Sequence, residues 1–192
     1  MNQADLLREL RDGGPGVLAV LGDPGQGKSR LLDYLLLHWP AEVLACDIEG
    51  AMRFPDERTT AGARIYYWPR PNWPKFRPDG QPNPLPSWRQ LAPGGLVVVD
   101  ELDKVCCGAP IWLRWALDAL NQVRSRSRWL AWSVRRPQAR FGIPRDATAC
   151  ARYFVWFRQH EQVALDYAAT LLPDANVLRT LPPRSFVFLR LW

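Results

Sequence analysis

The chain has 192 residues, of which 47% are hydrophobic and 23% charged, and its formal net charge is +6. This length and composition are typical of one folded domain and exclude a disordered tail. No run of about twenty apolar residues occurs and the N-terminal segment lacks the apolar centre of a secretory signal. We therefore expect an intracellular protein without a transmembrane segment.

Apolar patterning predicts alternating helices and strands along the chain. The expected elements of the first half are a helix over residues 5–11, a strand over 16–22, a helix over 28–39, and strands over 42–49 and 63–70. Residues 69–93 hold eight of the eighteen prolines, a density that excludes regular structure apart from a short helical turn at 87–91.

The second half continues the alternation. We expect a strand over residues 94–102, a helix over 110–123, strands over 129–134 and 151–157, a helix over 161–171 and a terminal strand over 185–192. This order predicts an α/β fold in which helices flank a mainly parallel sheet that gains additional C-terminal strands. We expect one domain over residues 1–192, with residues 69–93 as an insertion or loop.

A phosphate-binding loop follows the first strand. The sequence GDPGQGKS at residues 22–29 matches G-x-x-x-x-G-K-[ST], in which backbone N–H groups surround the phosphates, the lysine contacts the β- and γ-phosphates and the serine ligates Mg²⁺. The residues expected to bind the nucleotide are Gly22, Asp23, Pro24, Gly25, Gln26, Gly27, Lys28, Ser29 and Arg30. The motif lies between a buried strand and a helix, as this geometry requires.

Two carboxylates end the strand LVVVDE at residues 96–101. Asp100 is placed to hold Mg²⁺ together with Ser29, and Glu101 to polarise the attacking water. The alternative is that both carboxylates end the strand in solvent. An acidic pair after a phosphate loop favours an ATPase that hydrolyses ATP over a small-molecule kinase.

Arginines surround the next strand. Lysine occurs only three times in the chain, and arginines are concentrated after Arg114. The planar guanidinium suits phosphate contacts, although a GC-rich genome would favour the same codons. Arg124, or alternatively Arg126, is placed to reach the nucleotide of a neighbouring subunit. The other interpretation is a solvated or DNA-facing basic patch.

The order of these motifs resembles the FtsK–HerA superfamily of pumping ATPases. The likeness includes the segment SVRRPQ at residues 133–138 and is strongest to the ATPases that package the genomes of membrane-containing icosahedral double-stranded DNA viruses. In that family a glutamine usually faces the γ-phosphate. Here Arg135 stands at the corresponding position, as a candidate catalytic residue beside Glu101 and Arg124.

The resemblance implies a RecA/ASCE-like P-loop NTPase that uses ATP and Mg²⁺. It further implies a homo-oligomer, usually a hexameric ring, that moves double-stranded DNA into a preformed capsid. Partners would be capsid-vertex or viral membrane proteins, and the location would be the host cytoplasm or the packaging vertex of the virion.

Other functions stay open at this stage. A filamentous-phage assembly ATPase is related, but usually carries a transmembrane helix. A small nucleotide-dependent kinase would need a lid, for which residues 69–93 are the candidate. A protein in which bound ATP controls a partner surface is a third class. Residues 69–93 could be a docking loop, a pore loop or a surface insertion, and exposed tryptophan and proline, which make rigid contacts, favour docking.

Overall fold

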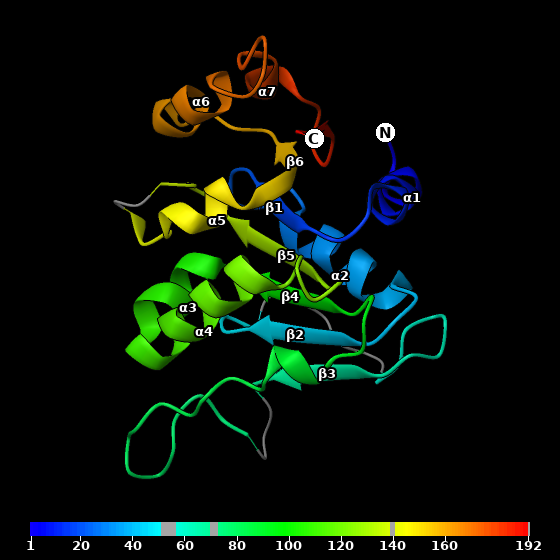
Figure 1. The fold of residues 1–192 in the computed structure, drawn as a ribbon. Coiled ribbons are helices and arrows are strands. Elements are labelled where there is room, and N and C mark those ends of the chain that lie inside the picture. The colour runs from blue at the N-terminus through cyan, green and yellow to red at the C-terminus, as the bar shows by residue number, and fades with distance from the viewer. Residues whose placement is uncertain (51–56, 70–72, 139–140, 192) are drawn as a thin grey trace.

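The computed structural model describes residues 1–50, 57–69, 73–138 and 141–191. Within these ranges the centre of the protein is a seven-stranded sheet in the order β3-β2-β4-β5-β1-β6-β7 (Figure 1). Its strands are β1 (Val17–Leu21), β2 (Val43–Asp47), β3 (Ile65–Trp68), β4 (Leu96–Asp100), β5 (Trp129–Val134), β6 (Ala151–Phe157) and β7 (Phe186–Arg190). The final parts of two expected strands, residues 70 and 192, lie outside the described residues, as do residues 71–72 of the proline-rich segment.

The sheet is mainly parallel, as expected from the sequence. Strands β1 to β6 pair in parallel, and only β7 runs antiparallel, beside β6. Every residue of β1, β2, β4 and β5 is buried, because helices cover both faces of the sheet. Strands buried on both faces are built from continuous apolar runs, which explains the pattern of these four segments.

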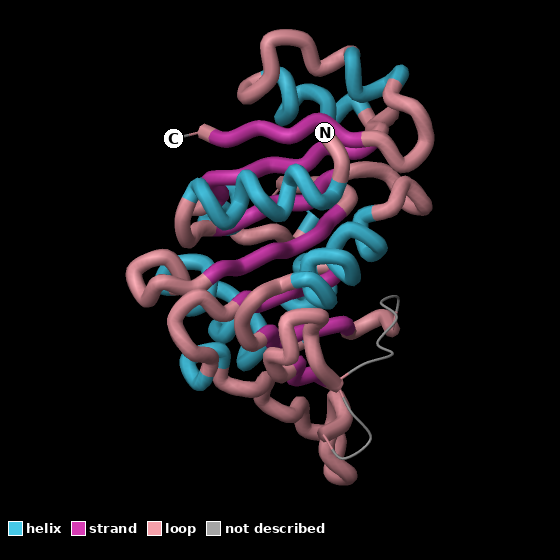
Figure 2. The backbone as a smooth tube through the Cα atoms, turned by 90° about the vertical axis from the view of Figure 1, so that its right-hand side faces the viewer, coloured by secondary structure: helices cyan, strands magenta, loops and turns pink. Residues whose placement is uncertain are grey.

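Helices lie on both sides of the sheet. They are α1 (Gln3–Gly13), α2 (Lys28–His38), α3 (Leu102–Gly108), α4 (Pro110–Gln122), α5 (Arg145–Ala149), α6 (Gln162–Ala169) and α7 (Val177–Thr180). Helices α1 and α2 pack on one face, where Figure 2 shows them in front of the strands. Helices α3, α4 and α5 pack on the other. None of the helices in the described ranges is long and apolar enough to cross a membrane.

The proline-rich segment is held against α4 by tryptophans. The indole of Trp112 donates to the carbonyl of Asn83 at 2.6 Å, and that of Trp115 donates to Pro86 at 2.9 Å. The expected short helix is present as the 3-10 helix η1 (Trp88–Gln90), and the indole of Trp88 donates to Asp118 at 2.9 Å. The indole N–H groups thus pair with carbonyl oxygens of the proline-rich segment and with the carboxylate of Asp118 on α4.

Candidate functional site

The phosphate loop occupies the turn between β1 and α2, at the carboxyl edge of the parallel strands. Gly22 and Gly27 have φ values of 150° and 111°, which favour glycine because a Cβ would be strained there. A Cβ at Gly22 would also lie 2.6 Å from the Cβ of Phe157. Helix α2 begins at Lys28, so its N-terminal N–H groups and the positive end of its dipole face the loop.

The ammonium group of Lys28 lies inside the loop. Its Nζ donates to the carbonyl oxygens of Gly22 at 2.9 Å and Asp23 at 3.1 Å. Burial lowers the pKa of Lys28 below its ordinary value, and the negative charges of Asp100 and Glu101 oppose that shift. The lysine is therefore a partly desolvated cation, which strengthens its attraction for phosphate oxygens.

Asp100 lies beside the first turn of α2. The hydroxyl of Ser29 donates to Asp100 Oδ2 at 2.7 Å, and the hydroxyl of Ser133, on β5, donates to Asp100 Oδ1. Asp100 is only 1% exposed. A serine hydroxyl and a carboxylate in contact are hard oxygen donors of the kind that Mg²⁺ prefers, so Ser29 and Asp100 could hold this ion.

Glu101 has an unusual backbone conformation. Its φ of 52° and ψ of 67° are left-handed, a conformation that costs about 1–3 kcal/mol for a non-glycine residue and occurs often at functional sites. Its N–H donates to the hydroxyl of Ser133 at 3.0 Å, which stabilises the turn out of β4. Burial raises the pKa of Glu101, and the neighbouring charges of Asp103 and Asp100 add to the shift.

Ser133 also belongs to this site. The sequence predicted a strand at this position but did not indicate a function for the serine. It is fully buried and its hydroxyl connects Asp100 to the backbone of Glu101. The signal was present, because Ser133 is the one polar residue in the run WLAWSV. A buried hydroxyl needs hydrogen-bond partners. Because β5 pairs with β4, the partners of Ser133 are Asp100 and Glu101 at the end of β4.

Arg135 follows β5 near the loop but is already paired. It forms an ion pair with Glu161, which Arg136 also contacts through two hydrogen bonds. The charge of Arg135 nevertheless helps to lower the pKa of Lys28, so the guanidinium lies within electrostatic range of the phosphate loop. A sensor role for Arg135 stays a prediction, and it requires release from Glu161.

Arg124 lies away from the phosphate loop of its own chain, and its expected action on a neighbouring subunit stays a prediction. Helix α4 runs back across the sheet, and the turn after it leads into the start of β5, where Trp129 pairs with Leu96 at the amino ends of the strands. Burial raises the pKa of Cys150, and the nearby charge of Arg124 opposes that shift. The phosphate loop lies at the opposite edge of the sheet, so Arg124 does not lie beside the phosphate loop of its own chain.

The segment after β6 supports the phosphate loop. The buried Asp23 accepts hydrogen bonds from the backbone N–H of His160 at 3.0 Å and pairs with its ring Nδ1 at 2.7 Å. The N–H of Asp23 donates to Arg158 at 3.0 Å. The sequence pattern gave this segment no role, because its contact with the loop depends on β6 lying next to β1.

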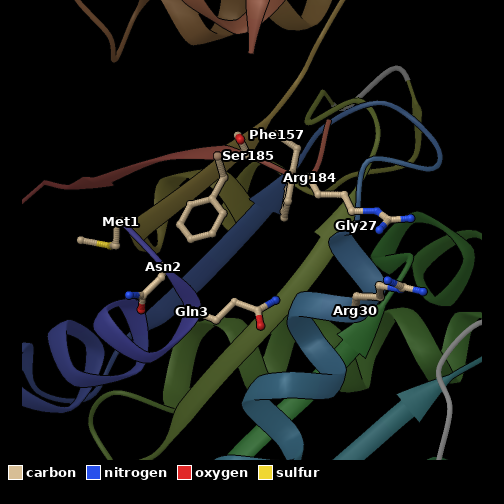
Figure 3. Close-up of a pocket in the computed structure, with 9 residues that line it drawn as sticks. Met1, Asn2, Gln3, Gly27, Arg30, Phe157, Arg184 and Ser185 are labelled. Atoms are coloured by element: carbon tan, nitrogen blue, oxygen red, sulfur yellow. The ribbon is translucent and has the colours of Figure 1, made fainter. Parts of the chain in front are cut away.

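A second arginine lies at the loop together with Arg30. Arg184, from the turn before β7, lines the same cavity as Gly27, Lys28 and Ser29, a cavity of about 230 Å³. Figure 3 shows Arg30 and Arg184 extending in the same direction near Gly27. Arg184 was not among the expected site residues, and no local pattern in the sequence indicates it.

Comparison with known proteins identifies the fold. The chain is similar to the genome packaging NTPase B204 from Sulfolobus turreted icosahedral virus 2 in complex with AMPPCP, with a TM-score of 0.59 and 13% sequence identity over 99% of this chain and 94% of that chain. The same NTPase in complex with ATP-gammaS gives a TM-score of 0.60 and 14% identity, covering 91% of this chain and 92% of that chain.

A conjugation coupling protein shares the fold. The pCW3 conjugation coupling protein TcpA matches with a TM-score of 0.59 and 16% identity, over 94% of this chain and 59% of that chain. No family model matches the sequence, and none of the curated proteins is significantly similar to it. The chain shares the fold of these proteins, and this confirms the P-loop NTPase fold expected from its sequence.

Proposed function

We propose that this protein is an ATPase that hydrolyses ATP to move double-stranded DNA into a preformed viral capsid. The observation that carries the proposal is the contact between the Ser29 hydroxyl and the Asp100 carboxylate at 2.7 Å. Lys28 and Glu101 are the sequence neighbours of these two residues. Lysine, metal ligands and a carboxylate base are the parts that ATP hydrolysis requires. The shared fold with a genome packaging NTPase supports the DNA-handling role.

Each residue has a chemical task in this proposal. The loop N–H groups and Lys28 bind the phosphates and neutralise their charge. Ser29 and Asp100 would hold a Mg²⁺ ion, which supplies further positive charge to the β- and γ-phosphate oxygens. Glu101 accepts a proton from the attacking water, and its raised pKa makes it a stronger base than an ordinary glutamate.

Two features support a ring that surrounds DNA. The net charge of +6 attracts a polyanion. Arg124 lies at the sheet edge remote from its own phosphate loop, where it is available to the nucleotide of a neighbour. We therefore propose a homo-oligomer, hexameric as in the resemblance, with catalysis completed between subunits.

The kinase alternative is less well supported. Strands β5, β4 and β2 lie between β1, which leads into the phosphate loop, and β3 at the edge of the sheet. The described part of the proline-rich segment leaves the sheet at that edge and packs on α4 (Figure 1), and its last residues return to the amino ends of β4 and β5. In this position it does not cover the phosphate loop as a kinase lid would. We propose that it contacts a capsid or viral membrane protein.

Displacement of a third DNA strand tests translocation directly. Double-stranded DNA carrying a short triplex is mixed with the protein and ATP, and release of the third strand is followed by gel electrophoresis. We expect ATP-dependent release of the third strand by the wild type and none by Glu101→Gln. We further propose that the protein acts in the host cytoplasm or at the packaging vertex of the virion. ATP hydrolysis without release would refute the motor function.

A further inference from the structure

The phosphate loop contains a carboxylate close to where the phosphates are expected to bind. Asp23 is the second residue of the loop and is only 9% exposed. Burial lowers the pKa of Lys28, and the negative charge of Asp23 is among those that oppose this shift. Asp23 therefore lies within electrostatic range of the lysine expected to bind phosphate. Its charge would repel a polyphosphate if nothing offset it.

His160 is the residue that pairs with this carboxylate. Its ring Nδ1 lies 2.7 Å from Asp23 Oδ2, and its backbone N–H donates to the same oxygen at 3.0 Å. A carboxylate oxygen accepts hydrogen bonds, so this contact assigns the ring hydrogen to Nδ1. The other oxygen, Asp23 Oδ1, is buried and has no hydrogen-bond partner among the residues that the structure describes. Within those residues, the Asp23 side chain is thus held by His160.

Asp23 connects His160 to Lys28. The backbone carbonyl of Asp23 accepts a hydrogen bond from Lys28 Nζ at 3.1 Å. Gly22 and Gly25 lie close on either side of Asp23 in the chain, and glycine allows the backbone many conformations. The contact between the Asp23 side chain and His160 therefore restricts the position of the carbonyl group that holds the Lys28 ammonium.

The segment that carries His160 is itself held from outside the phosphate loop. The preceding residue, Gln159, is fully buried. Its N–H donates to the carbonyl of Leu178 on α7 at 3.1 Å, and its side-chain amide donates to the carbonyl of Arg135 at 3.3 Å. Arg179 on α7 donates to the carbonyl of His160 at 3.4 Å. These contacts fix the backbone of His160, so that its ring is a stable point of attachment for the loop.

We infer that His160 is a positioning residue of the ATPase site, which holds the phosphate loop through Asp23 and offsets the charge of that carboxylate. This inference rests on the proposed ATPase function. In this role His160 acts on the ligand only through Asp23. Loss of the ring contact should therefore weaken the binding of any ligand that places a polyphosphate in the loop, whatever base it carries.

Two amide variants that differ by one methylene group test this role. The amide nitrogen of His160→Asn can take the place of Nδ1, whereas that of His160→Gln lies near the position of Nε2. Isothermal titration calorimetry in Mg²⁺ measures the affinities for AMPPCP and for inorganic tripolyphosphate. His160→Gln should lose about tenfold in affinity for both probes, as expected for one hydrogen bond to a charged group, and His160→Asn should stay within about threefold of the wild type. Because the His160 side chain is 58% exposed, both variants should fold.

A double-mutant cycle shows whether His160 acts through Asp23. In the background of Asp23→Ala, which removes the carboxylate, His160→Gln should change the affinity for tripolyphosphate by less than about twofold. In steady-state ATP hydrolysis, His160→Gln should raise KM about tenfold and keep kcat within about twofold, since the loop binds the ground state and the transition state alike. His38→Gln is the matched control, because this second histidine ends α2 at the end remote from the loop. It should keep the wild-type affinity.

Several results would overturn the inference while the proposed function stands. They are wild-type affinity of His160→Gln for both probes, a loss confined to AMPPCP, an equal loss in His160→Asn, or a full effect of His160→Gln in the background of Asp23→Ala. If His160→Gln fails to fold, His160→Ala takes its place in the same comparisons. A wild type that binds neither probe would refute the proposed ATPase function, and the inference with it.

Discussion

Replacing Ser133 by alanine tests how the site is assembled. The serine hydroxyl is fully buried and connects the Asp100 carboxylate to the N–H of Glu101. A hydrogen bond to a charged group contributes about 1.5–3 kcal/mol, and a buried donor left without a partner costs about 1–3 kcal/mol. These contributions are not fully additive, so we expect Ser133→Ala to lower the free energy of unfolding by about 2–4 kcal/mol.

The same substitution should affect turnover more than binding. Lys28 and the loop N–H groups do not contact Ser133, so ATP affinity should change little. Glu101 loses the bond that holds its left-handed backbone, and misplacement of a catalytic group by about 1 Å can reduce the rate by about a hundredfold. We therefore expect kcat to fall by about tenfold to a hundredfold.

Urea unfolding and steady-state ATP hydrolysis measure these two effects. Ser125→Ala is the matched control, because the Ser125 hydroxyl is exposed and donates only to the carbonyl of Gln122, at 3.0 Å. Its stability should lie within about 0.5 kcal/mol of the wild type. If Ser133→Ala has the stability and the kcat of the wild type, the hydroxyl of Ser133 does not bridge Asp100 and Glu101 in the way that these magnitudes assume.

Four further predictions concern the charged groups. Lys28→Ala should abolish nucleotide binding in calorimetry, and retained ATP hydrolysis would contradict the site. Glu101→Gln should bind ATP without hydrolysing it. Because the fold raises the pKa of Glu101, the charged carboxylate destabilises the folded state above that pKa. The melting temperature of Glu101→Gln should therefore exceed that of the wild type at neutral pH and equal it in acid. Asp103→Asn removes a cause of that shift and should move the acid limb of the pH–rate profile to lower pH. Arg124→Ala should bind ATP yet hydrolyse it slowly, and mixing it with Lys28→Ala should restore activity; no rescue would argue against catalysis between subunits.

Local patterns were sufficient for most of the fold. The strands expected over residues 129–134 and 151–157 have the same bounds as β5 and β6, because continuous apolar runs ended by polar residues are typical of buried parallel strands. Helix α3 was missed, since it begins directly after the left-handed Glu101 with no separate start signal. The short helices α5 and α7 were also missed, because they contain too few residues to show an apolar period and are stabilised by packing.

The phosphate loop could be predicted from sequence because one continuous motif contains it, whereas its surroundings could not. Arg184 and His160 reach the loop only because β6 and β7 extend the sheet beyond β1. The position of Arg124 could have been inferred, since a helix between parallel strands returns to the amino edge of the sheet. The pairing of Arg135 with Glu161 depends on the start of α6, which the sequence does not place next to β5.

The rate of ATP hydrolysis with and without double-stranded DNA tests the central proposal most directly. The wild type should hydrolyse ATP and accelerate several-fold when DNA is added, while Glu101→Gln should show no turnover in either condition. A wild-type rate that DNA leaves unchanged, or turnover that persists in Glu101→Gln, would contradict a DNA-moving ATPase built on this site.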